Sequence, residues 1–299
     1  MPVNKVAIAC FKKDLFLLRP CVASIRYWYP EAEIYLIKDY IQGKFSTREI
    51  EENFNVKTFP AQRKFFGWPW SKLAVILHDQ KAKYLFLDSD VVLLGKVLDR
   101  LNEFDDDFIV TGVRETQSSH NINAHYIDMK KIETFDPAYR FPGFGFNGGQ
   151  IVMTSGMLKE TDFESVINFE PSITSKHPDI FKHGDQGPLN YGFAKAAQNG
   201  KIKLRYEDFW IWPGIPAAQT IDLQSIKNKV GSPYVLHWAG LKPVDFRKYK
   251  RYDILKFYED YYYSKVPGGK AKKFWRRLRS LSIIKLKILK YKLLRMKYD

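Results

Sequence analysis

The sequence predicts an α/β fold with a mixed, mostly parallel sheet flanked by helices. Short apolar segments alternate with segments of helical spacing, the order of elements that builds such a sheet. One segment, residues 84–87, is apolar at every position and therefore predicts a central strand covered on both faces. Contents of 45% hydrophobic and 16% aromatic residues supply material for a sizeable core.

The predicted elements follow a strand, helix, strand order from the N-terminus. Residues 5–10 form a short apolar strand, and the helical spacing of residues 16–28 ends before Pro30, which cannot continue a helix. The remaining elements are helices at 71–80 and 186–198 and strands at 33–38, 84–87, 108–113, 150–154 and 234–237. No internal repeat is visible.

The net charge of +15 is concentrated at the C-terminal end. Residues 267–299 hold 12 of the 48 lysines and arginines but one of the 33 acidic residues, so this segment carries +11 and the rest carries +4. Pro267-Gly268-Gly269 marks the boundary, which predicts a domain at 1–266 and a tail at 267–299. A nearly neutral domain does not offer the extended basic surface of a nucleic-acid-binding protein.

The tail predicts a basic amphipathic helix. On a helical wheel one side holds Lys272, Arg276, Arg279, Lys287, Lys290 and Lys297. The opposite side holds Phe274, Leu278, Leu281, Ile288 and Leu289. Such a helix is expected to lie on an anionic membrane surface, while a solvated tail or an RNA-binding arm is the alternative.

A reducing compartment is expected, since one of only two cysteines, Cys10, lies inside an apolar strand. Residues 1–5 lead into the first strand without the pattern of a signal peptide, and no run reaches the roughly 18 apolar residues of a membrane span. The expected location is the cytoplasm, peripherally on the inner face of the membrane.

The segment Asp88-Ser89-Asp90 follows the predicted central strand. A period of two places both carboxylates on one face at the carboxyl edge of the sheet, where α/β sheets bind ligands. Adjacent carboxylates repel unless a cation neutralises them, which predicts a Mg²⁺ or Mn²⁺ site. A solvated loop or helix cap is the alternative. Residues 105–107 also contain Asp-x-Asp, but they precede a strand and predict a charged turn.

Three further segments combine polar groups with glycine or with a helix start. Asn147-Gly148-Gly149 precedes a strand and predicts either a hairpin turn or close approach of a ligand. Asp185-Gln186 opens a helix, where the acid either caps the first turn or acts in a site. His237 ends a strand, and Gly240 and Lys242 follow it in a position suited to a diphosphate.

These segments, in this order, resemble glycosyltransferase family 8, the nucleotide-sugar transferases that include glycogenin and bacterial lipooligosaccharide galactosyltransferases. The resemblance covers roughly residues 5–245. Its motifs are Trp70-Ser71-Lys72-Leu73, Phe86-Leu87-Asp88-Ser89-Asp90, Phe146-Asn147-Gly148-Gly149, Asp185-Gln186 and residues 237–243. It implies a GT-A fold and retaining transfer of a hexose from a nucleotide-diphosphate sugar, with UDP as the expected nucleotide. The implied acceptor is a saccharide or lipid-linked molecule of cell-surface glycan synthesis.

The resemblance also implies residue roles. Asp88, Asp90 and His237 would bind Mn²⁺ or Mg²⁺, and Asp185 and Gln186 would be the catalytic residues. The other expected donor-binding residues are Ala9, Cys10, Phe11, Lys72, Ser89, Asn147, Gly148, Gly149, Gly240 and Lys242. Two segments depart from the family: Lys242 follows His237 by five residues instead of six, and residues 11–14 do not match its usual Asp-containing segment.

Tryptophans in loops suggest an acceptor site. Trp210 and Trp212 lie near Pro213 and Gly214, where aromatic faces suit stacking on a sugar, although core packing is an equal alternative. Two other functions remain open. A sugar-phosphate nucleotidyltransferase would use similar chemistry but needs a glycine-rich segment after the first strand. A non-catalytic glycosyltransferase-like protein would act by binding membrane or RNA.

Overall fold

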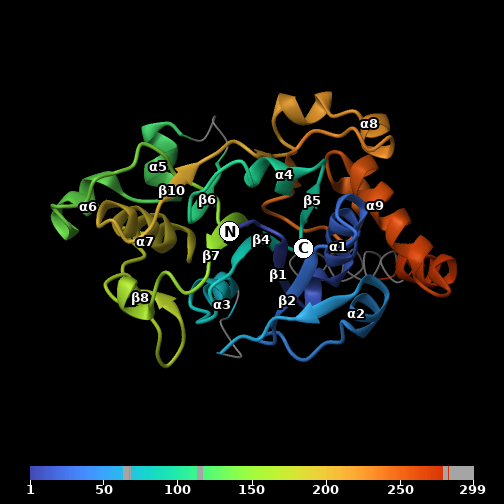
Figure 1. The fold of residues 1–299 in the computed structure, drawn as a ribbon, viewed down its shortest axis with the longest axis horizontal. Coiled ribbons are helices and arrows are strands. Elements are labelled where there is room, and N and C mark those ends of the chain that lie inside the picture. Colours follow the sequence, from blue (N-terminus) through green and yellow to red (C-terminus); the bar gives the residue numbers. More distant parts are fainter. Residues whose placement is uncertain (63–66, 68, 113–116, 279–281, 283–299) are drawn as a thin grey trace, which may run out of the picture.

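The computed structural model describes residues 1–62, 67, 69–112, 117–278 and 282. Within this part of the chain, the main sheet has seven strands in the order β10-β6-β7-β4-β1-β2-β3 (Figure 1). Their bounds are β1 Lys5–Phe11, β2 Glu33–Asp39, β3 Val56–Thr58, β4 Lys83–Asp88, β6 Phe108–Val110, β7 Gln150–Thr154 and β10 Leu204–Tyr206. Strand β7 runs antiparallel to β4 and β6, and the other described pairs of this sheet are parallel. The predicted fold class is confirmed.

Two smaller sheets complete the described strands. One has the order β11-β12-β5, with bounds β11 Trp210–Ile211, β12 Val235–His237 and β5 Val91–Leu93. The other is a hairpin of β8 Ile167–Asn168 and β9 Thr174–Ser175. Strand β12 pairs antiparallel with β5 and brings residue 237 opposite residue 91. The second sheet therefore carries a late segment of the chain back to the end of β4.

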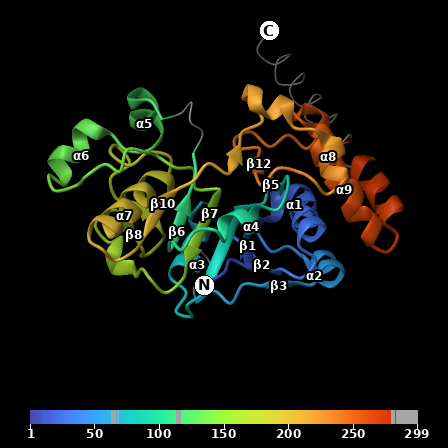
Figure 2. The same ribbon diagram turned by 45° about the horizontal axis from the view of Figure 1, so that its top comes forward.

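Helices cover both faces of the main sheet. The α-helices are α1 Leu15–Trp28, α2 Arg48–Phe54, α3 Leu73–Ile76, α4 Val97–Leu101, α5 Ser119–His125, α6 Met129–Phe135, α7 Gln186–Gln198, α8 Leu223–Lys227 and α9 Tyr252–Lys265. Short 3₁₀ segments are η1 Lys12–Asp14, η2 Trp70–Lys72, η4 Glu160–Asp162, η5 Pro216–Thr220 and η6 Phe246–Lys248. Figures 1 and 2 show α1, α2 and α9 at one end of the molecule and α5, α6 and α7 at the other.

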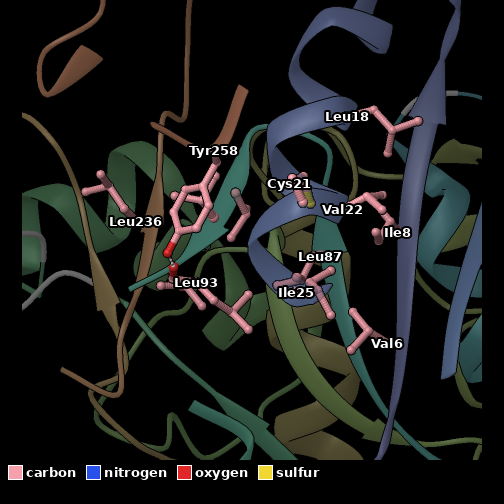
Figure 3. Close-up of a cluster of buried hydrophobic side chains, with 14 of the residues drawn as sticks. Val6, Ile8, Leu18, Cys21, Val22, Ile25, Leu87, Leu93, Leu236 and Tyr258 are labelled. Carbon is pink, nitrogen blue, oxygen red and sulfur yellow. Dashed lines mark hydrogen bonds between the residues drawn. The ribbon is translucent and has the colours of Figure 1, made fainter. Parts of the chain in front are cut away.

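The two-residue period of the strands creates a core on each face of the sheet. In β1, Val6 and Ile8 join the cluster beneath α1 and α9, whereas Ala7 joins the cluster beneath α3 and α7. In β4, Leu87 faces the first cluster and Phe86 the second. Figure 3 shows the first cluster, in which side chains of β1, β4 and α1 meet. The apolar run of the predicted central strand is thus buried on both faces.

Helix α9, which we did not predict, is fastened to this core by a buried tyrosine. The Tyr258 hydroxyl donates to the Leu93 carbonyl at 2.5 Å (Figure 3). The same hydroxyl accepts from Trp28 Nε1 at 2.9 Å. Burial raises the pKa of Tyr258, since a phenolate there would lose its hydration. One side chain therefore connects α9, α1 and the end of β5.

The predicted helix at 71–80 is shorter than expected. It begins as η2 and continues as α3, and the amide of Leu77 closes the last turn on the Leu73 carbonyl at 2.9 Å. The polar residues 78–80 then turn the chain into β4. Helical spacing overestimated the length because the chain must reach a strand that starts at residue 83.

Most of the predicted tail helix, residues 279–281 and 283–299, lies outside the described residues. Residues 269–278 are helical and follow a tight turn after α9. At Gly269 a Cβ would lie 1.9 Å from the Tyr263 carbonyl oxygen, so only glycine fits this turn. None of the helices in the part described combines the length and apolarity needed to cross a bilayer.

Replacing Tyr258 by phenylalanine should lower the free energy of unfolding by about 1–2 kcal/mol, because the buried Leu93 carbonyl loses its shorter hydrogen bond. Urea denaturation of both proteins measures the difference. Tyr252→Phe, at a position whose side chain is 46% exposed, is the control and should change stability little. Equal stabilities of Tyr258→Phe and the parent would contradict the proposed role of the Tyr258 hydroxyl in attaching α9 to the core.

Candidate functional site

A cleft of about 430 Å³ lies at the carboxyl ends of β4 and β12 and at the start of α7. Its size is within the range of small-molecule sites. Its lining residues are Pro69, Ser71, Lys72, Asp88, Asp90, Asn147, Gly148, Gly149, His183, Gly184, Asp185, Gln186, His237, Ala239, Gly240 and Lys242. The fold thus brings together residues from five separate sequence motifs at the predicted edge of the sheet.

Asp88, Asp90 and His237 form a group that could hold a metal ion. Asp88 ends β4, Asp90 lies in the following turn, and His237 ends β12. Each offers a ligand atom, and these atoms all lie within 4.8 Å of one another. The backbone fixes the arrangement, since the Trp238 amide donates to the Asp90 carbonyl at 3.2 Å.

The Asp90 carboxylate is buried and strongly charged. Neither of its oxygens accepts a hydrogen bond from the described residues, yet His237 Nε2 lies 3.4 Å from one oxygen and Lys242 Nζ 3.2 Å from the other. Burial raises the pKa of Asp90, but His237 and Lys242 outweigh it and lower the pKa to about 2. A buried carboxylate that stays ionised and whose oxygens accept no hydrogen bond is suited to binding a divalent cation.

Gln150, which sequence reasoning missed, orients the imidazole of His237. His237 Nδ1 lies 2.7 Å from Gln150 Oε1 in the buried interior. An amide oxygen only accepts, so this contact assigns a proton to Nδ1, and Nε2 is the nitrogen that faces Asp90 and could bind a metal. Such outer partners fix the orientation of metal-binding histidines.

Lys72 and Asp185 form a buried ion pair on the other side of the cleft. Their side chains are 4% and 8% exposed, so removal of either would leave a charge without its partner in a desolvated site. Burial raises the pKa of Asp185 despite the opposing effect of Lys72. The Asp185 side chain makes no capping hydrogen bond to α7, so the capping alternative is wrong.

The turn before β7 lies in close contact with the Asp88, Asp90 and His237 group and with the Lys72–Asp185 pair. A Cβ at Gly149 would lie 2.3 Å from His237 Cε1 and 2.8 Å from Asp88 Oδ2, and one at Gly148 would lie 2.9 Å from Lys72 Nζ. The Asn147 side chain accepts from the Gly149 amide at 2.8 Å. Residues 148–149 join β7 to a long connection from β6, so the hairpin alternative is wrong.

Gln186 is held by both ends of its side-chain amide. Asn147 Nδ2 donates to Gln186 Oε1 at 3.2 Å, and Gln186 Nε2 donates to the His125 carbonyl at 3.0 Å. The first residue of α7 therefore presents its amide to the cleft in a fixed orientation.

The end of β1 lines a narrow recess beside the cleft. Ala9, Cys10 and Phe11 lie there with Ser89 and two acids that we did not predict, Asp14 and Asp39. The recess shares residues Ser71, Asp88 and Lys242 with the main cleft.

Asp14 belongs to the same charge network as Asp90. Its Oδ2 is 3.3 Å from Lys242 Nζ and accepts from Ser89 Oγ at 3.3 Å. Burial raises the pKa of Asp14 to about 6, with Lys242 opposing and Asp90 adding to the shift. Its position just after the first strand could have indicated this role, but residues 11–14 do not match the family segment.

The two tryptophans of the predicted acceptor site lie outside the residues that line the cleft. Trp210 is buried, and its ring centroid is 5.7 Å from that of His237, which fits the core-packing alternative. Trp212 is 41% exposed. Gly240, in contrast, lines the cleft with a φ of +114°, a conformation that favours glycine.

Comparison with solved structures identifies the fold as that of the GT-A glycosyltransferases. No family model matches the chain, and no curated protein sequence matches it. The galactosyltransferase LgtC, solved with donor and acceptor sugar analogues, has a TM-score of 0.56 at 15% identity over 88% of this chain and 97% of LgtC.

Two larger glycosyltransferases share the same fold. The bifunctional enzyme WbbM has a TM-score of 0.56 at 14% identity, with 90% of this chain covered and 51% of WbbM. GlyE of Streptococcus pneumoniae TIGR4 has a TM-score of 0.50 at 16% identity, with 88% of this chain and 60% of GlyE covered. At these identities the likeness concerns the fold.

Gly149→Ala should weaken binding of Mn²⁺ at least about tenfold, because the added methyl group would overlap His237 and displace it from Asp88. Isothermal titration calorimetry measures the change. The matched control is Gly148→Ala, whose methyl group would meet Lys72 and Asp185 instead and should affect Mn²⁺ less. Equal affinities of the two variants would refute the assignment of Gly149 to the metal group.

Proposed function

We propose that this protein is a metal-dependent glycosyltransferase that moves a hexose from a nucleotide-diphosphate sugar, with UDP as the nucleotide. The observation that carries the proposal is the group of Asp88, Asp90 and His237 beside Lys242, at the sheet edge where α/β folds bind ligands. The GT-A fold supports it, because the solved structures that share this fold are glycosyltransferases.

Two carboxylates and one imidazole would hold Mn²⁺ or Mg²⁺. Their ligand atoms lie within 4.8 Å, and the carboxylate oxygens suit hard divalent ions. When bound, the ion supplies Lewis-acid stabilisation of the negative charge that develops on the departing diphosphate.

Lys242 would contact the diphosphate as a full positive charge. Burial lowers the pKa of this lysine, but the surrounding carboxylates, Asp90 above all, outweigh burial and raise it above its ordinary value. Lys72 and Asp185 offer a donor and an acceptor to hydroxyl groups of the donor sugar across the cleft. The end of β1, which borders the narrow recess, would contact the nucleoside.

In the proposed reaction the bond between the anomeric carbon and the leaving phosphate oxygen breaks, and the acceptor hydroxyl oxygen bonds to that carbon. The hydroxyl proton passes to the departing diphosphate, so no protein base is required. Gln186 is fixed at the wall of the cleft, where its amide dipole would stabilise the positively charged sugar. We propose that transfer retains the anomeric configuration.

The proposed acceptor is a saccharide or lipid-linked molecule of cell-surface glycan synthesis, of the lipopolysaccharide or capsule type. LgtC, the structural neighbour solved with an acceptor sugar analogue, supports a saccharide. Trp212 has the exposed ring that stacking on a sugar requires.

Asp90→Ala should reduce Mn²⁺-dependent hydrolysis of a UDP-sugar at least about a hundredfold, because it removes a ligand and leaves Lys242 beside fewer carboxylates. The assay measures UDP release over a panel of UDP-sugars. Asp105→Ala, which changes the exposed first residue of the second Asp-x-Asp segment, should keep full activity.

Two results would contradict the proposal. One is metal-independent turnover that Asp90→Ala leaves unchanged. The other is formation of UDP-sugar from UTP and a sugar phosphate with release of pyrophosphate, which would identify a nucleotidyltransferase.

We also propose that the tail binds the cytoplasmic surface of an anionic membrane. Some basic residues of the tail contact the protein itself. Lys273 pairs with Asp260 and Arg276 pairs with the buried Glu259, both in α9. Lys272 lies 2.9 Å from Glu49. The basic side of this first part of the helix therefore faces the protein.

The outward side of the same helix carries three apolar side chains together with the exposed Arg277. Phe274, Trp275 and Leu278 are 58%, 67% and 39% exposed. Aromatic rings of this kind favour the boundary between headgroups and acyl chains. The proposed contact therefore combines insertion of these three side chains with attraction of the later basic residues to anionic lipid.

Replacing Phe274, Trp275 and Leu278 together by alanine should lower recovery with phosphatidylglycerol vesicles at least about tenfold, because the inserted apolar surface is lost. Vesicle flotation with the full-length protein measures recovery. Val230→Ala, at an apolar position of the body that is 71% exposed, is the control. Equal recovery of the triple variant and the parent would contradict the proposal that these three side chains insert into the membrane.

A further inference from the structure

Two histidines meet at the rim of the cleft, outside the group assigned to the metal. His125 ends α5, and His183 lies in the loop before α7. His125 Nδ1 is 3.1 Å from His183 Nε2, and the rings lie at a centroid distance of 5.2 Å with 25° between their planes. Both residues are exposed, so ions from solvent reach them.

The backbone holds the two segments together without the rings. The Lys182 amide donates to the Tyr126 carbonyl at 2.9 Å, and Ile127 and Phe181 form an antiparallel bridge. The pair is therefore organised before any ligand binds.

The loop also places His183 in an uncommon conformation. Its φ is +52°, and Gly184 follows at +65°. A left-handed conformation is uncommon for a residue with a side chain, and such positions concentrate at functional sites.

We propose that His125 Nδ1 and His183 Nε2 bind a first-row transition ion such as Zn²⁺ or Ni²⁺, in a second site with water in the other coordination positions. Two imidazoles on one tetrahedral ion have nitrogens about 3.3 Å apart, given metal–nitrogen distances of about 2.0–2.1 Å. The observed separation of 3.1 Å is close to this value. Imidazole ligands suit these ions, whereas the carboxylate-rich group suits harder ones.

The electrostatic surroundings favour metal binding by His125. Partial burial, together with the neighbouring His183 and His120, lowers the pKa of His125. A neutral imidazole is the form that ligates a metal, so this shift supports its role as a ligand.

An ion at this site would act on Gln186. Gln186 Nε2 donates to the carbonyl of His125, and His183 lines the cleft beside it. The positive charge of such an ion would lie near the positively charged sugar that Gln186 is proposed to stabilise, and it would oppose formation of that sugar. Occupancy should therefore inhibit sugar transfer; this consequence rests on the proposed function, whereas ion binding itself does not.

Calorimetric titration of Ni²⁺ into the Asp90→Ala protein tests the site, because that substitution disables the carboxylate group. We expect one Ni²⁺ site, weakened at least tenfold by His125→Ala and by His183→Asn. Asparagine tolerates the left-handed backbone of residue 183, so that variant keeps the loop conformation. His177→Ala is the matched control and should bind as its parent does.

The outcomes decide between a site and a simple hydrogen-bonded pair. Absence of Ni²⁺ binding, or an affinity that neither substitution at 125 nor 183 changes, overturns the proposal. A second assay follows UDP-sugar hydrolysis at saturating Mn²⁺, where added Ni²⁺ should inhibit the parent protein at least tenfold more strongly than His125→Ala, each relative to its own rate. If hydrolysis is absent, the proposed function fails while the calorimetric result still decides the site.

Discussion

The site depends on one ammonium group held between buried carboxylates. Lys242 Nζ lies 3.2 Å from Asp90 and 3.3 Å from Asp14, and both acids are almost completely buried. Asp14 and Asp90 have lost most of their hydration and repel each other. Lys242, and a cation held by Asp88, Asp90 and His237, would compensate for both effects. His237 and Lys242 lower the pKa of Asp90 despite its burial, whereas burial raises the pKa of Asp14 despite the same lysine. A diphosphate that engaged Lys242 would compete with both acids, so donor and metal binding are expected to be coupled.

The backbone brings these charges together through close contact of strands. The Asp88 amide donates to the Gly149 carbonyl at 2.7 Å, which extends the ladder between β4 and β7 by one residue into the cleft. That contact leaves no room for a side chain at residue 149 beside His237. Strand β12 reaches the same place by pairing with β5. The group of Asp88, Asp90 and His237 is therefore assembled by two sheets, and a shift in either sheet would separate these side chains.

Elements with a strong local signal could be predicted from the sequence, and those fixed by tertiary contacts could not. Strand β7 and helix α7 begin and end where periodicity placed them, because apolar runs and a helix start mark both. Strand β5 was missed, since its three residues carry no period of their own and pair with a segment far along the chain. Asp14 was missed although it lies just after the first strand, because a single acid in a basic segment does not identify the lysine that it meets in the fold. The pairing of Lys72 with Asp185 likewise depends on the fold, which joins them across 113 residues.

The net charge of the tail overestimates the positive charge that it presents to solvent. Its wheel predicted a basic face for lipid, yet Lys272, Lys273 and Arg276 pair with Glu49, Asp260 and Glu259 of the protein. Glu259 of α9 is buried, so its carboxylate needs the positive charges of Lys273 and Arg276. These ion pairs hold the helical residues 269–278 against α9. Charge used in this way is unavailable to attract anionic lipid. In the proposed membrane contact, Phe274, Trp275 and Leu278 would therefore supply the part nearest the protein, and the basic residues after them would supply the electrostatic attraction.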